Sequence, residues 1–206
     1  MKRYIAGLLV LCLIGCSKPI DSQKVNMHEE FTMLEEENHF TIAQKDSVVP
    51  FLEHGTGILL LAYPEDEWSQ AFALQLEEVI QNVDMNANYY NIHVDESEDP
   101  SFYKQICHLL EDQNDSTFGV YKESDGKRLI DIPMILFVSE GRITHLISPT
   151  SFDEGKHSST DLFRDETVQQ QFKNELQEHA ETIKKKQDEL HSEGCDTGCE
   201  AFENND

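Results

Sequence analysis

The hydrophobic and polar positions of this chain alternate between short apolar runs and longer stretches with apolar residues every third or fourth position. Residues 58–62 form an unbroken apolar run between Gly57 and Pro64, which is typical of a strand buried on both faces of a sheet. The segment after this run predicts an amphipathic helix, because apolar residues recur at helical spacing: Trp68, Phe72, Leu76, Val79 and Val83. The turn 63–69 therefore leads from the carboxyl end of a central strand to a helix N-terminus, where α/β folds place their chemistry.

The same patterns predict the remaining elements of one α/β domain. Further strands are expected at 39–43, 89–94, 131–138 and 142–147. Further helices are expected around 48–52 with an end at Gly55, after Pro100, and from Asp165 onward with an end at Gly194. Residues 111–117 and 148–164 are predicted to be loops, and 123–126 a turn.

The first residues have the pattern of a bacterial lipoprotein signal peptide. A short basic start precedes the apolar run 5–14, which is too short to span a bilayer stably. The run ends in Leu13-Ile14-Gly15-Cys16, which matches the lipobox. We therefore expect cleavage after residues 1–15 and a mature chain that begins at Cys16 and is anchored by palmitate or related acyl chains on the extracytoplasmic side of a bacterial cell membrane. An ordinary signal peptide with a chance cysteine is the alternative.

Composition divides the mature chain into three parts. Residues 16–38 are acidic with few apolar positions, which predicts a flexible tether. Residues 39–192 are expected to form the folded domain, and 193–206 a tail that contains Cys195 and Cys199. The formal charge is −24, and loss of the signal peptide makes it more negative because Lys2 and Arg3 are its only charged residues. Such a charge disfavours binding to nucleic acid or to anionic lipid surfaces.

The order of elements resembles the thioredoxin fold, with a buried strand, a loop containing Trp68, a long helix, and Ile132-Pro133 at the opening of a β-hairpin. More narrowly, it resembles the lipid-anchored thioredoxin-like proteins of Gram-positive bacteria, over roughly residues 40–190. The resemblance implies a central mixed sheet of four to five strands flanked by helices, with a long C-terminal helix. It also implies that the Ile132–Pro133 bond is cis and lies against the turn.

In that family the turn typically reads Pro-Glu-Cys-Pro-Trp-Cys, whereas this chain reads Pro-Glu-Asp-Glu-Trp-Ser at 64–69. Asp66 stands in the place of the nucleophilic cysteine, Glu67 in that of the proline and Ser69 in that of the resolving cysteine. Thiol–disulfide exchange needs both thiols, and neither a carboxylate nor an unassisted serine replaces them. Asp66 is instead suited to cap the helix. The turn is thus a degenerate active site, and no catalytic residue, cofactor or metal is expected there.

Three functions remain open. The leading one is a non-catalytic accessory lipoprotein that holds an extracytoplasmic peptide or protein at Trp68, Ile132 and Pro133. The alternative is a thiol–disulfide oxidoreductase that uses Cys195 and Cys199, which otherwise form a structural disulfide. The third is a surface-exposed spacer lipoprotein without a binding groove.

Two further features of the sequence give weaker signals. His191, Cys195 and Cys199 have a spacing that could supply metal ligands, but Gly194 and Gly198 interrupt the helix and no fourth ligand is evident. No metal site is therefore predicted. Cys107 lies among the apolar residues of the helix after Pro100, so we expect it to be buried as a small apolar residue.

Overall fold

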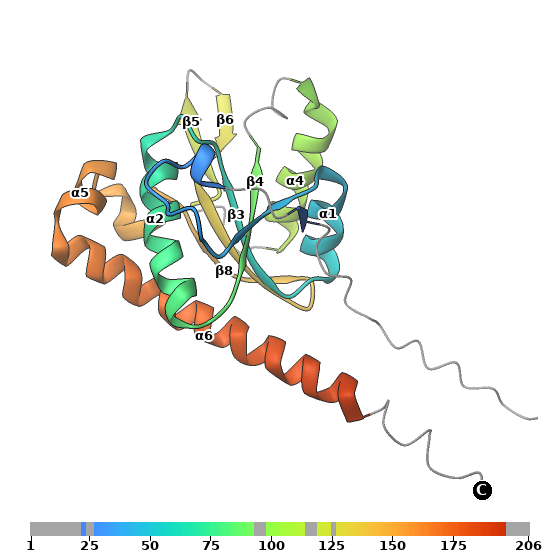
Figure 1. The fold of residues 1–206 in the computed structure, drawn as a ribbon. Helices are drawn as coiled ribbons and strands as arrows, with labels where there is room; N and C mark the ends of the chain where they lie inside the picture. The colour runs from blue at the N-terminus through green and yellow to red at the C-terminus, as the bar shows by residue number, and fades with distance from the viewer. Residues whose placement is uncertain (1–21, 24–26, 93–97, 114–118, 125–126, 197–206) are drawn as a thin grey trace, which may run out of the picture.

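The computed structural model describes residues 22–23, 27–92, 98–113, 119–124 and 127–196. Figure 1 shows a twisted central sheet with helices on both of its faces and a long helix, α6, that runs past the body of the domain. Among the described residues, no helix is long and apolar enough to cross a membrane.

The elements follow one another in an α/β order. The strands are β1 (Ser22–Gln23), β2 (Phe40–Ala43), β3 (Gly57–Ala62), β4 (Ala87–Asn91), β5 (Tyr121–Ser124), β6 (Lys127–Ile130), β7 (Met134–Ser139) and β8 (Arg142–Ile147). The α-helices are α1 (Lys45–His54), α2 (Glu67–Asn82), α4 (Pro100–Gln113), α5 (Ser159–Arg164) and α6 (Glu166–Asp196). The part of the chain that the structure describes also has two short 3-10 helices, η1 (Met27–Glu29) and η2 (Phe152–Gly155).

The main sheet has the strand order β1-β2-β4-β3-β7-β8, and β5 and β6 form a separate hairpin. Strands β2, β4 and β3 are parallel, whereas β7 and β8 are antiparallel to their neighbours. This mixed sheet, flanked by helices and followed by a long C-terminal helix, confirms the predicted fold class and is consistent with a thioredoxin-like arrangement. A sixth strand is present because the two residues of β1 add to the edge beside β2.

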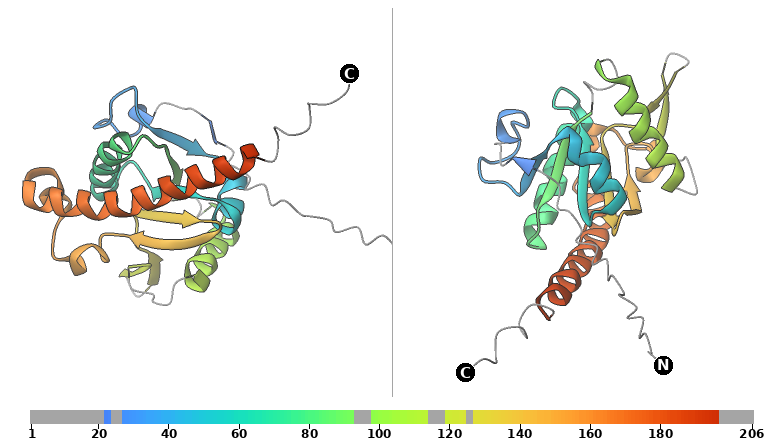
Figure 2. Two further views of the ribbon diagram at one scale, coloured as in Figure 1. Left: turned by 90° about the horizontal axis from the view of Figure 1, so that it is seen from below. Right: turned by 90° about the vertical axis from the view of Figure 1, so that its right-hand side faces the viewer.

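The sheet separates two hydrophobic cores, which explains the unbroken apolar run of β3. Ile58 and Leu60 belong to the core under α2 and α6, and Leu59 and Leu61 to the core under α1 and α4. All six residues of β3 are buried, so the prediction of a strand buried on both faces is confirmed. Figure 2 shows α6 lying across one face of the sheet alongside α2.

The predicted flexible tether at 16–38 is wrong for its second half. Met27 and Phe31 are fully buried and Leu34 is nearly so, all three within the core under α2 and α6. The Phe31 ring packs edge-on against Tyr89 with 5.1 Å between ring centroids. These three residues have helical spacing, and the intervening acids face solvent, so a segment that is acidic overall still buries an apolar face. We call residues 27–38 the N-terminal strap.

Other boundaries also differ from those predicted. The segment 148–164, expected as a loop, contains η2 and α5, and α5 begins with a capping box between Ser158 and Asp161. The turn expected at 123–126 connects a complete β-hairpin. Helix α6 continues through Gly194 to Asp196, so the predicted helix end at Gly194 and the boundary at 192/193 are wrong. A single glycine costs a helix only about 1 kcal/mol, which does not by itself end a long one.

Candidate functional site

The turn between β3 and α2 is closed by hydrogen bonds among its own residues. Asp66 is the N-cap of α2, and its Oδ2 accepts hydrogen bonds from the backbone N–H of Ser69 at 2.7 Å and from Ser69 Oγ at 3.0 Å. The N-cap role predicted for Asp66 is therefore confirmed. A carboxylate at this position is favoured because it satisfies an otherwise unpaired N–H and faces the positive end of the helix dipole.

Ser69 completes this closed arrangement. Its side chain is fully buried, and its Oγ accepts a hydrogen bond from the backbone N–H of Tyr63 at 3.3 Å while it donates to Asp66. The hydroxyl thus joins the end of β3 to the start of α2. Because Ser69 has no exposed surface, it cannot reach a substrate without rearrangement of the turn, so the neighbouring carboxylate does not make it a nucleophile.

Glu67 and Trp68 point outward from the same turn. Glu67 is exposed, and its Oε2 accepts a hydrogen bond at 3.2 Å from Ser159 Oγ at the start of α5. Trp68 is half-buried and packs edge-on against Phe72 with 5.8 Å between ring centroids. Helix α5, which the sequence did not predict, thus helps to hold the start of α2.

The strand entry that carries Pro133 lies beside this turn. The Ile132–Pro133 bond is cis, as the resemblance implies, and Leu61 of β3 is paired with Met134 of β7. This register places Pro133 next to Ala62, where the turn begins. However, both Ile132 and Pro133 are buried, and the Ile132 N–H already donates to the carbonyl of Ile130 at 3.1 Å. Of the three residues predicted to bind a peptide, Trp68 alone is partly exposed.

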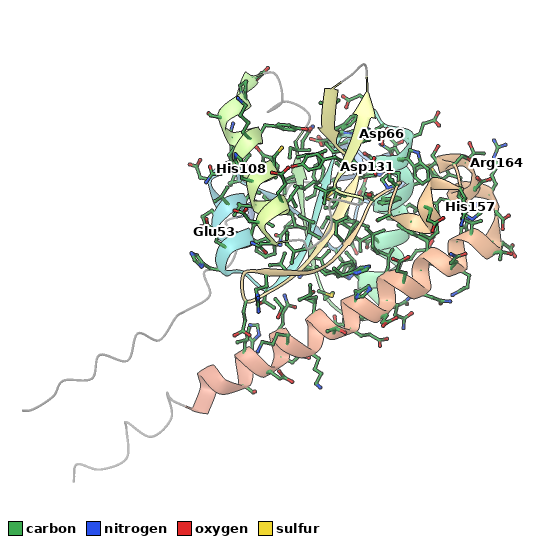
Figure 3. All side chains as sticks on the ribbon, turned by 180° about the vertical axis from the view of Figure 1, so that it is seen from behind. Glu53, Asp66, His108, Asp131, His157 and Arg164 are labelled. Atoms are coloured by element: carbon green, nitrogen blue, oxygen red, sulfur yellow. The ribbon has the colours of Figure 1, made fainter. Side chains whose placement is uncertain are left out.

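Asp131 is a buried residue of this region that sequence reasoning missed. It is 3% exposed, and its Oδ2 accepts a hydrogen bond from the Thr150 N–H at 2.8 Å. Its own N–H donates to the carbonyl of Val120 at 2.9 Å. Figure 3 shows Asp66 and Asp131 at the same end of the sheet, at the start of α2 and the entry to β7. Asp131 therefore ties the strand that carries Pro133 to the loop after β8.

The surroundings of the turn are strongly acidic. Burial, followed by the nearby Glu30 carboxylate, raises the pKa of the Tyr89 hydroxyl well above its ordinary value. That hydroxyl donates a hydrogen bond to Glu30 Oε2 at 3.1 Å, and Glu65 adds a smaller effect in the same direction. Carboxylates of both the strap and the turn therefore lie close enough to the Tyr89 hydroxyl to disfavour its ionisation.

The other predicted site residues lie apart from the turn. Cys16 and Cys199 fall outside the described residues, and Cys195 lies on the last turn of α6 with its side chain not described. Cys107 on α4 is half-buried against the core under α1 and α4, rather than fully buried. Within the described part of the chain, no group of three or more His, Cys, Asp or Glu side chains is arranged to hold a metal ion.

Comparison of the chain with models of protein families, with curated proteins and with solved structures gives no match. The fold and the chemistry of the turn must therefore carry the functional argument.

Proposed function

We propose that this protein is an extracytoplasmic, lipid-anchored thioredoxin-like protein that binds a peptide or protein and has no redox activity at its α2 turn. The observation that carries this proposal is the pairing of Asp66 with Ser69. These two residues occupy the places of the two cysteines, and each uses the other as a hydrogen-bond partner. The turn 63–69 thus contains no thiol that could attack a disulfide.

The part of the turn that faces solvent supports a binding role. Trp68 packs partly against the core under α2 and α6 and is partly exposed, and the neighbouring Glu65 and Glu67 are exposed. Tryptophan is enriched where proteins contact one another, because its ring buries a large area at a small cost in conformational entropy. Ile132 and Pro133 are buried beside the turn and offer little surface to a partner.

An insulin-reduction assay tests the loss of redox activity. We expect no reduction by the purified ectodomain, with or without a Cys195→Ser/Cys199→Ser change. In that changed background, Asp66→Cys/Ser69→Cys should introduce activity, because the two side chains already approach within 3.0 Å. Activity of the unaltered ectodomain that disappears with Cys195 and Cys199 would establish the oxidoreductase alternative. Activity that persists without those cysteines would refute the proposal.

Photo-crosslinking in intact cells tests the binding role. A crosslinker at exposed Glu65 should capture a partner, and Trp68→Ala should reduce the yield. Met33→Ala is a matched control, because Met33 is an exposed apolar residue of the strap and 53% of its surface is accessible. Equal yields from the two variants, or no captured partner, would favour a spacer without a binding site.

The lipid anchor is tested separately. Growth with radiolabelled palmitate should label the full-length chain, and Cys16→Ala should abolish the label. A labelled Cys16→Ala chain would contradict the anchoring site.

A further inference from the structure

Strand β1 and the N-terminal strap together attach the chain to the domain close to the proposed anchor. Ser22 and Gln23 pair with Ala43 and Ile42 of β2, and Met27 is already fully buried. The domain therefore begins at residue 22, and not at residue 39 as the sequence predicts.

Several contacts hold the strap in place. The side chains of Met27, Phe31 and Leu34 are buried, and burial of each is worth about 1.5–3 kcal/mol. The Glu30 carbonyl accepts a hydrogen bond from Gln70 Nε2 at 3.2 Å, and the Glu30 carboxylate accepts one from Tyr89. These contacts join the strap both to α2 and to β4.

The docked strap shortens the chain between the anchor and the domain. Six residue steps separate Cys16 from Ser22, and in any conformation they span at most about 20 Å. If the chain were undocked as far as residue 38, the span could reach roughly 75 Å. The contacts of the strap therefore limit how far the domain can move from the bilayer.

Strand β1 lies at the end of the sheet where β3 leads into the turn 63–69. Ile42 of β2 and Leu60 of β3 are both paired with Tyr89 of β4, so the next residues, Ala43 and Leu61, also lie at the same height in the sheet. Because Ser22 is paired with Ala43, Ser22 lies at the height of Leu61, just before the turn. Strands β1 and β3 are three positions apart, which corresponds to roughly 14 Å at the usual strand spacing.

We propose that the N-terminal strap holds the α2 turn near the membrane surface, so that its partner is the extracytoplasmic part of another membrane-bound protein. This inference rests on the lipid anchor of the proposed function. A short tether raises the effective concentration of the turn toward partners at the same height and excludes distant ones. The exposed face of the strap is acidic and is repelled by anionic lipid headgroups, so the covalent anchor sets the distance.

Energy transfer from Trp68 to dansyl-labelled lipid headgroups measures this distance, because Trp68 is the single tryptophan of the chain. The lipidated full-length protein is reconstituted in vesicles. A 20-residue Gly-Ser insertion after Pro19 raises the root-mean-square length of the link between Cys16 and Ser22 from about 13 Å to about 28 Å and should lower the transfer at least about twofold. The same insertion after Glu203 is the matched control and should leave the transfer unchanged.

The outcomes separate this inference from the proposed function. Failure to incorporate palmitate at Cys16 would remove the anchor and both proposals with it. Normal lipidation with equal transfer before and after the insertion at Pro19 would overturn the inference alone. A Phe31→Ser/Leu34→Ser variant should approach the transfer of the Pro19 insertion if it keeps the far-ultraviolet circular dichroism of the folded domain.

A crosslinker at Glu65 in intact cells tests the class of partner. A membrane-bound partner should be captured by the unaltered chain, and its yield should fall when the Gly-Ser insertion after Pro19 is present. A soluble partner captured equally by both chains would overturn the inference.

Discussion

Replacing Phe31 by alanine tests whether the strap is part of the folded domain. The Phe31 ring is fully buried and contacts Tyr89 edge-on. A phenylalanine buries about 200 Å² in a core, which at about 25 cal/mol per Å² gives an upper bound of roughly 5 kcal/mol. Measured Phe→Ala losses in cores are about 3–5 kcal/mol. The strap can detach instead of leaving a cavity, so its own docking free energy limits the loss, and we expect about 2–4 kcal/mol.

Urea denaturation followed by Trp68 fluorescence and by far-ultraviolet circular dichroism measures this loss. If the strap detaches in the variant before the domain unfolds, less surface is exposed in the main transition and the dependence on urea becomes shallower. Met33→Ala is the control in the same strap, because Met33 is exposed, and its effect should stay within about 0.5 kcal/mol. Equal stabilities for Phe31→Ala and Met33→Ala would refute the docking of the strap.

Three further predictions concern other parts of the domain. Asp66→Ala removes the acceptor for the Ser69 N–H and Oγ and should lower the free energy of unfolding by about 1–2 kcal/mol. Asp66→Asn should retain most of that stability, because asparagine also caps helices. Equal losses for the two variants would contradict the cap. Gly141→Ala should lower the free energy of unfolding, measured by urea denaturation, by roughly 2–4 kcal/mol, because φ of Gly141 is +74° and a Cβ would lie 1.9 Å from the Glu53 carbonyl oxygen. An unchanged free energy of unfolding would contradict this packing. The pKa of His179 is lowered by burial and by His145, whose ring stacks on it at 3.6 Å, while Glu175 and Glu178 act in the opposite direction. As pH falls, His179 is therefore protonated in the unfolded chain before it is protonated in the folded domain. The free energy of unfolding should fall as pH drops below the ordinary value of 6.5 and level off below the folded-state pKa. An unchanged pH profile in His179→Gln would refute this prediction.

The central strand and the helix after it were predictable because their signals are local. The apolar run of β3 and the apolar face of the helix from Trp68 to Val79 can be recognised from neighbouring residues alone, whichever other elements bury them. The cap at Asp66 was also predictable, since an N-cap bonds a backbone N–H only three residues away. The absence of a thiol from residues 63–69 can be read from the sequence directly.

The strap and α5 were missed for a different reason. The apolar residues of the strap are separated by polar and acidic residues, so their pattern is weak in the sequence. Their burial depends on contacts with α2 and β4, which are distant in sequence. Helix α5 has six residues, which is too short for helical periodicity to stand out. In both segments, contacts with residues distant in sequence supply the stability that local propensity lacks.

The sequence by itself determined the buried strand, the capped helix and the absence of cysteine from the turn 63–69. Only the tertiary structure decided that Ser69 is buried between Tyr63 and Asp66, that Pro133 is buried beside the turn, and that residues 27–38 dock onto the domain. The reason is physical: residue type and spacing decide which groups need burial or a hydrogen-bond partner, but the fold decides which distant surface provides it.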